Sequence, residues 1–268
     1  MWLYALIGFA AGSIVSCWQG YKDPPWEGFV LAKFMRSILT GVALGVAAYW
    51  MLRLGTVTVD NLGVLLLAIL ATERLVGETY KGFLRRGPHP EYHKLLHRLR
   101  IPAGNGSFRI LSGILFLAGG LCLYWGFGRL GGMILDRFGE GVAGGLLVGG
   151  AAGTLVAIGG AAKDSQFEGF KPKKFVRSPI MAALGTTVLV RVSDQPWLIS
   201  IGAIGLERVM VEWYKTFFTR QVRGIHAGKA PTHPEWLERR WVFYVGFLMA
   251  VAFCGVLLVA GKLMKPPV

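Results

Sequence analysis

Apolar residues fill eight stretches of the chain, and short polar segments rich in lysine and arginine separate them. A helix rises about 1.5 Å per residue, so each stretch is long enough, or nearly so, to cross about 30 Å of hydrocarbon. The pattern therefore predicts an all-α, polytopic integral membrane protein with eight transmembrane helices. The predicted spans are residues 2–18, 37–52, 62–83, 108–126, 142–162, 179–190, 197–218 and 241–260.

One charged block occurs twice, which indicates an internal duplication. Residues 22–37 read KDPPWEGFVLAKFMRS, and residues 163–178, 141 positions later, read KDSQFEGFKPKKFVRS, with nine residues identical in register. We therefore expect two tandem four-helix membrane repeats, residues 1–131 and 132–268. The duplicated loop block includes Lys22, Asp23, Glu27, Gly28 and Phe29 in the first copy, and Lys163, Asp164, Glu168, Gly169 and Phe170 in the second.

The orientation of the repeats follows from their span number and from charge. Four spans per repeat place both repeats the same way up, related by an axis along the membrane normal. Of the 29 Lys and Arg residues, 23 lie on the side that carries the duplicated block. The positive-inside rule places that side in the cytoplasm and both termini outside. We expect a protein of a bacterial or archaeal cytoplasmic membrane.

Small residues and one proline bear on how the predicted spans pack. Gly8 and Gly12 lie four positions apart, as do Gly149 and Gly153 in the second repeat. This spacing lets helices approach closely in lipid. Pro179 opens the sixth predicted span, where a first-turn proline loses no intrahelical hydrogen bond.

A second duplicated motif, E-R-x-x-x-E-x-Y-K-x-F, closes the third span of each repeat. Its polar members are Glu73, Arg74, Glu78, Tyr80 and Lys81, and in the second copy Glu207, Arg208, Glu212, Tyr214 and Lys215. On a helix, each arginine and the second glutamate are i,i+4 neighbours. The first glutamate lies about 12 Å deeper than the lysine. Ionisable groups at such depth cost roughly 2.5–3.5 kcal/mol unless paired or hydrated, so we expect Arg36 or Arg177 as partner.

Two interpretations of this charged cluster compete. It could line a cytoplasm-facing vestibule that handles a charged solute or a lipid headgroup. It could instead be a self-neutralised network that ties the duplicated block to the helix ends. The first repeat has five cations (Lys22, Lys33, Arg36, Arg74 and Lys81) against four carboxylates, Asp23 and Glu27 among them. This near balance favours the network, and retention of the charges in both copies argues against catalysis.

A third echo, Pro88–Tyr92 against Thr232–Trp236, leads into the last span of each repeat. His89, His93 and His97 have helical spacing and could bind a metal, but the second copy lacks the last two histidines. The interleaved leucines and cations predict instead an amphipathic helix over residues 90–100, lying on anionic lipid. Its cations are Lys94, Arg98 and Arg100.

Composition supports membrane insertion and names no reaction. The chain of 268 residues is 53% hydrophobic, with a mean hydropathy of +0.49 and a net charge of +14. In a soluble protein this charge would indicate nucleic acid; here it sets topology and meets anionic headgroups. Cys17, Cys122 and Cys254 lie in apolar runs. No P-loop, G-x-S-x-G, H-E-x-x-H or C-x-x-C motif is present, so we expect no cofactor, metal or nucleic-acid partner.

Three functions remain open. The leading hypothesis is a transporter- or channel-like protein that handles an ionic or amphipathic solute at the interface of the repeats. The first alternative is a non-enzymatic structural or accessory subunit of a membrane complex. The second is a lipid-modifying enzyme whose paired carboxylates act as acid and base. The partners we expect are anionic membrane lipids, with homo-oligomers or membrane-complex subunits left open.

Overall fold

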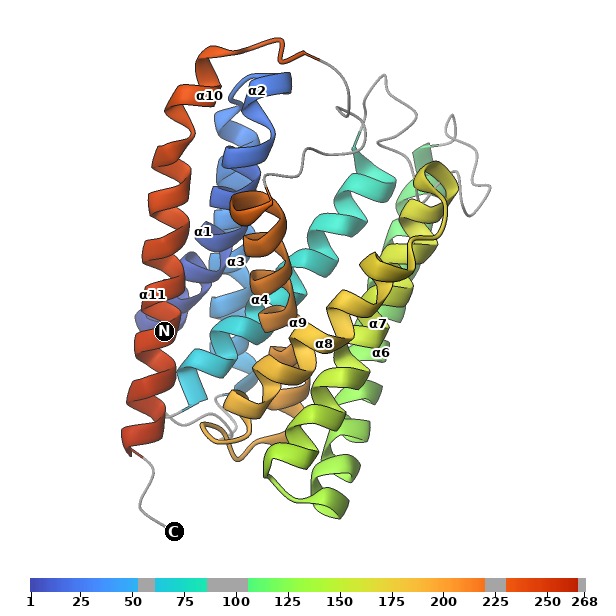
Figure 1. The fold of residues 1–268 in the computed structure, drawn as a ribbon, viewed down its shortest axis with the longest axis vertical. Coiled ribbons are helices and arrows are strands. Elements are labelled where there is room, and N and C mark those ends of the chain that lie inside the picture. Colours follow the sequence, from blue (N-terminus) through green and yellow to red (C-terminus); the bar gives the residue numbers. More distant parts are fainter. Residues whose placement is uncertain (53–60, 86–105, 220–229, 265–268) are drawn as a thin grey trace.

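The computed structural model describes residues 1–52, 61–85, 106–219 and 230–264, and these residues form helices and short connections without strands. Figure 1 shows the arrangement. The elements are α1 (Trp2–Lys22), α2 (Pro24–Glu27), α3 (Leu31–Leu52), α4 (Leu62–Thr79), the π-helix η2 (Tyr80–Leu84), α6 (Gly106–Phe138), α7 (Val142–Glu168), α8 (Pro172–Leu189), α9 (Pro196–Trp213), the π-helix η4 (Tyr214–Phe218), α10 (Glu235–Arg239) and α11 (Trp241–Met264).

Five stretches of helix in the described ranges are long and apolar enough to cross a membrane, which indicates an integral membrane protein. They are Trp2–Lys22, Leu31–Met51, Gly106–Phe138, Val142–Ala162 and Glu235–Leu263. The other long helices, α4, α8 and α9, are 18 residues each, and each contains three charged residues. Each of the five apolar helices, in contrast, contains an 18-residue stretch with at most two charged residues.

Helices α4 and α9 pack against each other in the middle of the bundle (Figure 1). Helix α1 pairs with α3, and α7 pairs with α8. Helix α11 covers α1 and α4, whereas α6 covers α7 and α9. The last helix of each predicted repeat therefore packs on the other predicted repeat, so the two stretches of sequence are interlocked.

The first half of α4 is buried along its whole length. Every residue from Leu62 to Ala71 is buried, and most of them are leucine or another aliphatic residue. On the facing helix, a Cβ added to Gly205 would collide with the backbone of Leu67, so the two helices touch through their main chains. Below the duplicated motif, the contact between α4 and α9 is therefore apolar, and the main chains of the two helices lie close together.

The close approach predicted from glycine spacing is present in both helix pairs. A Cβ at Gly12 in α1 would collide with the carbonyl of Ser37 in α3, and a Cβ at Gly153 in α7 would collide with that of Ser178 in α8. Gly8 and Gly149 meet backbone atoms of the facing helix in the same way. The contact between α1 and α3 thus recurs between α7 and α8 at the sequence offset of 141.

The duplicated block is mostly helical, which corrects its prediction as a loop. In the second copy α7 continues to Glu168 and α8 begins at Pro172. The chain reverses at Gly28 and Gly169, whose φ angles of 71° and 69° favour glycine. Pro172 is the first-turn proline of α8, so the prediction that Pro179 begins this helix is wrong. Pro179 lies inside α8, where it removes one intrahelical hydrogen bond.

Candidate functional site: a charged cluster where α4 and α9 end

The duplicated E-R-x-x-x-E-x-Y-K-x-F motif spans the same structural junction in both copies. Its two glutamates and its arginine lie in the last turns of α4 and of α9. The tyrosine and lysine lie in the π-helices η2 and η4, which continue these helices. Single π-helical turns occur frequently at functional sites.

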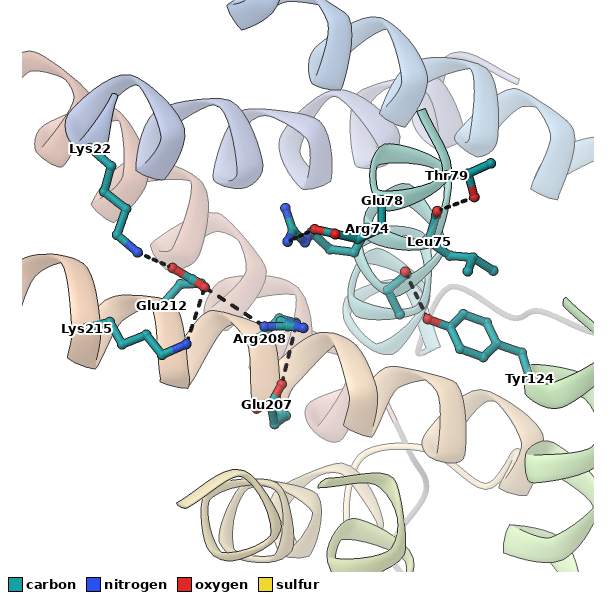
Figure 2. Close-up of polar contacts among 11 residues, drawn as sticks. Lys22, Arg74, Leu75, Glu78, Thr79, Tyr124, Glu207, Arg208, Glu212 and Lys215 are labelled. Carbon is teal, nitrogen blue, oxygen red and sulfur yellow. Dashed lines mark hydrogen bonds and ion pairs between the residues drawn. The ribbon is translucent and has the colours of Figure 1, made fainter. Parts of the chain in front are cut away.

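Three cations converge on the carboxylate of Glu212 (Figure 2). Lys22 Nζ, at the end of α1, lies 2.6 Å from Glu212 Oε2. Arg208 Nη1 and Lys215 Nζ each lie 3.9 Å from Glu212 Oε1. Side-chain exposure is only 13% for Lys22 and 11% for Glu212, so water screens this pair weakly. The predicted i,i+4 pair of Arg208 and Glu212 is present, but Lys22 makes the closer contact.

In the first copy the predicted i,i+4 pair is close. Arg74 Nη2 lies 2.8 Å from Glu78 Oε1. The Arg74 guanidinium also lies over the ring of Trp18, 5.5 Å from its centroid. From α6, the hydroxyl of Tyr124 donates a hydrogen bond of 3.2 Å to the carbonyl of Ala71. Tyr124 therefore contacts α4 about one turn before the Arg74–Glu78 ion pair (Figure 2).

The two deep carboxylates, Glu73 and Glu207, are buried, with exposures of 2% and 0%. Ser37 of α3 lies beside Glu73, whose Oε2 has no hydrogen-bond partner in the described ranges. Neither carboxylate oxygen of Glu207 accepts a hydrogen bond from the described residues, and its ion pair with Arg208 is 3.8 Å long. Buried polar groups are normally hydrogen-bonded, so each exception calls for a reason such as a bound water, ion or ligand.

Arg36 and Arg177 do not form the predicted direct pairs with these carboxylates. The Arg36 guanidinium lies over the Tyr80 ring at 4.6 Å, and Arg177 lies over the Tyr214 ring at 5.8 Å. Each arginine is thus held by the aromatic residue of the same motif, in the same way in both copies. The tyrosine lies on the π-helical turn, whereas the glutamate lies seven residues, about two turns, deeper in the helix.

The first copy of the duplicated block forms a separate network. Lys33 Nζ lies 2.6 Å from Asp23 Oδ2 and 2.8 Å from Glu27 Oε2, and Arg85 lies 3.9 Å from Glu27. These contacts tie the break after α1 to the start of α3. Two carboxylates that the sequence interpretation assigned to the charged cluster are therefore used elsewhere.

Other residues of the block have structural contacts or lie outside the description. The Phe29 ring stacks on Phe243, while Phe170 packs on Phe175 in a more exposed position. The side chains of Lys163, Asp164 and Glu168 lie outside the described part of the structure. So do His89, His93 and His97, and the predicted lipid-binding cations Lys94, Arg98 and Arg100.

Seven cations and four carboxylates make up the charged cluster, an excess of three positive charges. It comprises Lys22, Arg36, Arg74, Lys81, Arg177, Arg208, Lys215, Glu73, Glu78, Glu207 and Glu212. The near balance in the sequence was counted with Lys33, Asp23 and Glu27, which lie in the separate network and are not members of this cluster. A partly buried cationic excess attracts anions.

Three residues of the site were missed by the sequence interpretation. Trp18 and Tyr124 lie in apolar spans, where an aromatic residue gives no sign of a polar contact. Ser37 was visible, because it closes the duplicated block and recurs as Ser178. Its position beside Glu73 depends on how α3 packs beside α4, which the spacing does not show.

The described residues contain no group of three or more His, Cys, Asp or Glu side chains that could hold a metal ion. Cys17, Cys122 and Cys254 are free thiols. The chemistry that the described site offers is therefore ionic: guanidinium and ammonium donors facing carboxylates in a poorly hydrated setting. Comparisons with models of protein families, with curated proteins and with solved structures found no match for this chain.

Proposed function

We propose that the protein is a transporter- or channel-like membrane protein for an anionic solute, and that the charged cluster is its binding site on the cytoplasmic side. The observation that carries this proposal is the convergence of Lys22, Arg208 and Lys215 on the single carboxylate of Glu212. Three cations around one carboxylate form a site that a carboxylate, phosphate or sulfate group of a solute fits.

The binding step is an exchange of anions. A solute anion takes the place of Glu212 on Lys22 and on the two nearby cations, and a dianion such as phosphate or sulfate raises the negative charge among these cations by one. The cationic excess of the cluster supports this step, because an additional anion lowers the electrostatic cost of holding seven cations together. Glu207 holds Arg208 through a 3.8 Å ion pair while Glu212 moves. Both carboxylate oxygens of Glu207 are free of hydrogen-bond donors in the described ranges.

The architecture that we propose has eight spans in two parallel repeats, residues 1–131 and 132–268. Helices α4 with η2, α8, and α9 with η4 complete the five apolar spans. Two recurrent contacts support the duplication: glycine against serine carbonyl in the helix pairs, and arginine over tyrosine at the motifs. The distribution of Lys and Arg supports a cytoplasmic position for the cluster, with both termini outside.

A structural or accessory role is the second candidate, because the α4–α9 contact is apolar and close. In that case the ion pairs only hold α1, α4 and α9 together. The two functions differ in what an added anion does: it occupies a site in the first and has no site in the second.

Reconstitution in liposomes tests the transport proposal. Vesicles loaded with phosphate, sulfate or succinate should release at least one of these anions faster with the protein than without it. Arg208→Gln should abolish the additional release, because it removes a cluster cation that contacts both Glu207 and Glu212. Arg191→Gln, at an exposed arginine beyond the far end of α8, is the matched control and should behave as wild type. Release of none of the three anions above the protein-free rate would contradict the proposal.

A further inference from the structure

We propose that the outer face of α8 binds one anionic phospholipid, with Lys173 and Arg177 holding the phosphate. Arg177 also belongs to the charged cluster, but the inference needs only the membrane and no transport, and Lys173 lies outside that cluster. It also differs from the predicted lipid contact of residues 90–100, which lies outside the described residues.

A shallow groove of about 540 Å³ runs along this face. It is lined by Pro172, Lys173, Val176, Arg177, Ile180 and Met181. These residues form two stripes with a spacing of four, so that Lys173 and Arg177 are neighbours one helical turn apart. The surface of the groove is apolar, so Lys173 and Arg177 line it through their aliphatic stems, and their charged groups lie at its rim near the start of α8.

The order of these groups matches a phospholipid. Val176 and Ile180 are 50% and 53% exposed, since the described structure packs α8 on α7 and α9 through its other faces. An acyl chain covers such side chains in a membrane, and the phosphate lies above it, at the level of the two cations. A phospholipid matches both the apolar groove and the cations beside it. A free anion needs no apolar groove, and an apolar segment needs no cations.

The two cations have different roles. Arg177 is held on its protein side, because its guanidinium lies over the Tyr214 ring at 5.8 Å. Its position is therefore set by the protein before lipid binds, which lowers the cost of ordering it. Lys173 is exposed one turn nearer the aqueous side and supplies the second charge.

The first copy of the block offers a natural comparison. At the offset of 141, the counterpart of Arg177 is Arg36, but the counterpart of Lys173 is Ala32. The face of α3 keeps exposed apolar residues, Met35 and Leu39, in place of Val176 and Ile180. Only the second copy therefore has two cations above an apolar groove, so we infer one lipid site rather than two.

Native mass spectrometry of the purified full chain tests this assignment, with phosphatidylglycerol and phosphatidylcholine of identical acyl chains as probes. Wild type should retain one phosphatidylglycerol in preference to phosphatidylcholine. Lys173→Ala, which reproduces the alanine of the first copy, should weaken that retention about fivefold, as expected for one charge near a membrane surface. Lys173→Arg should keep it.

The converse substitution gives a gain of binding. Ala32→Lys, at an exposed position beside Arg36, should add a second retained phosphatidylglycerol. Lys262→Ala, which removes an exposed lysine near the other end of the bundle, is the control for net charge and should change nothing. Equal retention by wild type and Lys173→Ala would overturn the inference, and so would equal retention of the two lipids by wild type. A folded Ala32→Lys variant without a second lipid would also overturn it.

Discussion

Lys22 Nζ and Glu212 Oε2 lie 2.6 Å apart although 190 positions separate the residues in the chain. The pair joins the end of α1 to the end of α9, and therefore the first predicted repeat to the second. Both side chains are largely buried, so an unpaired charge at either residue would lower the free energy of unfolding.

The first prediction concerns the energy of this pair. Lys22→Gln and Glu212→Gln should each destabilise the protein by about 3 kcal/mol, because each leaves one charge without its closest partner. The double variant should lose clearly less than the sum, since both charges are then absent. Thermal unfolding in detergent measures all four proteins. Additive losses would show that the two side chains are not coupled.

The second prediction compares the two carboxylates that contact Arg208. Glu207→Gln should lower thermal stability less than Glu212→Gln. The Glu207 oxygens accept no hydrogen bond from the described residues and are 3.8 Å from Arg208, whereas Glu212 receives Lys22 at 2.6 Å. The same unfolding assay measures both variants at one ionic strength. A larger loss for Glu207→Gln would mean that its carboxylate is held by contacts stronger than these.

The third prediction concerns the repeated helix contact. Gly12→Ala and Gly153→Ala should each cost about 1–3 kcal/mol, because the new Cβ collides with the backbone of the facing helix. Gly150→Ala is the control: a Cβ there meets nothing within 4 Å. Melting temperatures of the three variants report the difference. Tolerance of Gly12→Ala together with a loss for Gly153→Ala would argue against an equivalent contact in the two copies.

The fourth prediction concerns topology. In a variant without the native cysteines, a single cysteine at Glu140 should react with an impermeant thiol reagent added to intact cells. Single cysteines at Lys171 and Glu235 should be protected, because the excess of Lys and Arg places them in the cytoplasm. All three positions are exposed in the described structure. Labelling of Lys171 but not Glu140 would reverse the orientation, and labelling of only one of Lys171 and Glu235 would contradict the two proposed spans, α8 and α9, between these positions.

Much of the local structure was predictable from the sequence. Apolar run length predicts the helices, and residue spacing predicts the Arg74–Glu78 pair and the close approach at Gly12 and Gly153. These features depend on neighbours one or two turns apart, or on the absence of a side chain. Helix boundaries were less predictable: α8 begins seven residues before Pro179, since the polar start of this helix resembles a loop.

The assembly of the site was not predictable in the same way. Nothing in the motif shows that Lys22 pairs with Glu212 while the nearby Lys33 takes Asp23 and Glu27. These choices depend on how α1 lies beside α9, which is a property of the packed bundle. Likewise, no local sequence signal shows that α6 packs on helices of the second predicted repeat and α11 on helices of the first.

Anion rescue of Glu212→Gln tests most directly whether the cluster is an anion site. The substitution removes the carboxylate that Lys22, Arg208 and Lys215 share, and so leaves the place of one anion empty. We predict that phosphate, sulfate or succinate, compared with chloride at equal ionic strength, raises the melting temperature of Glu212→Gln more than that of wild type. Equal responses of the two proteins to every anion would contradict the proposed site.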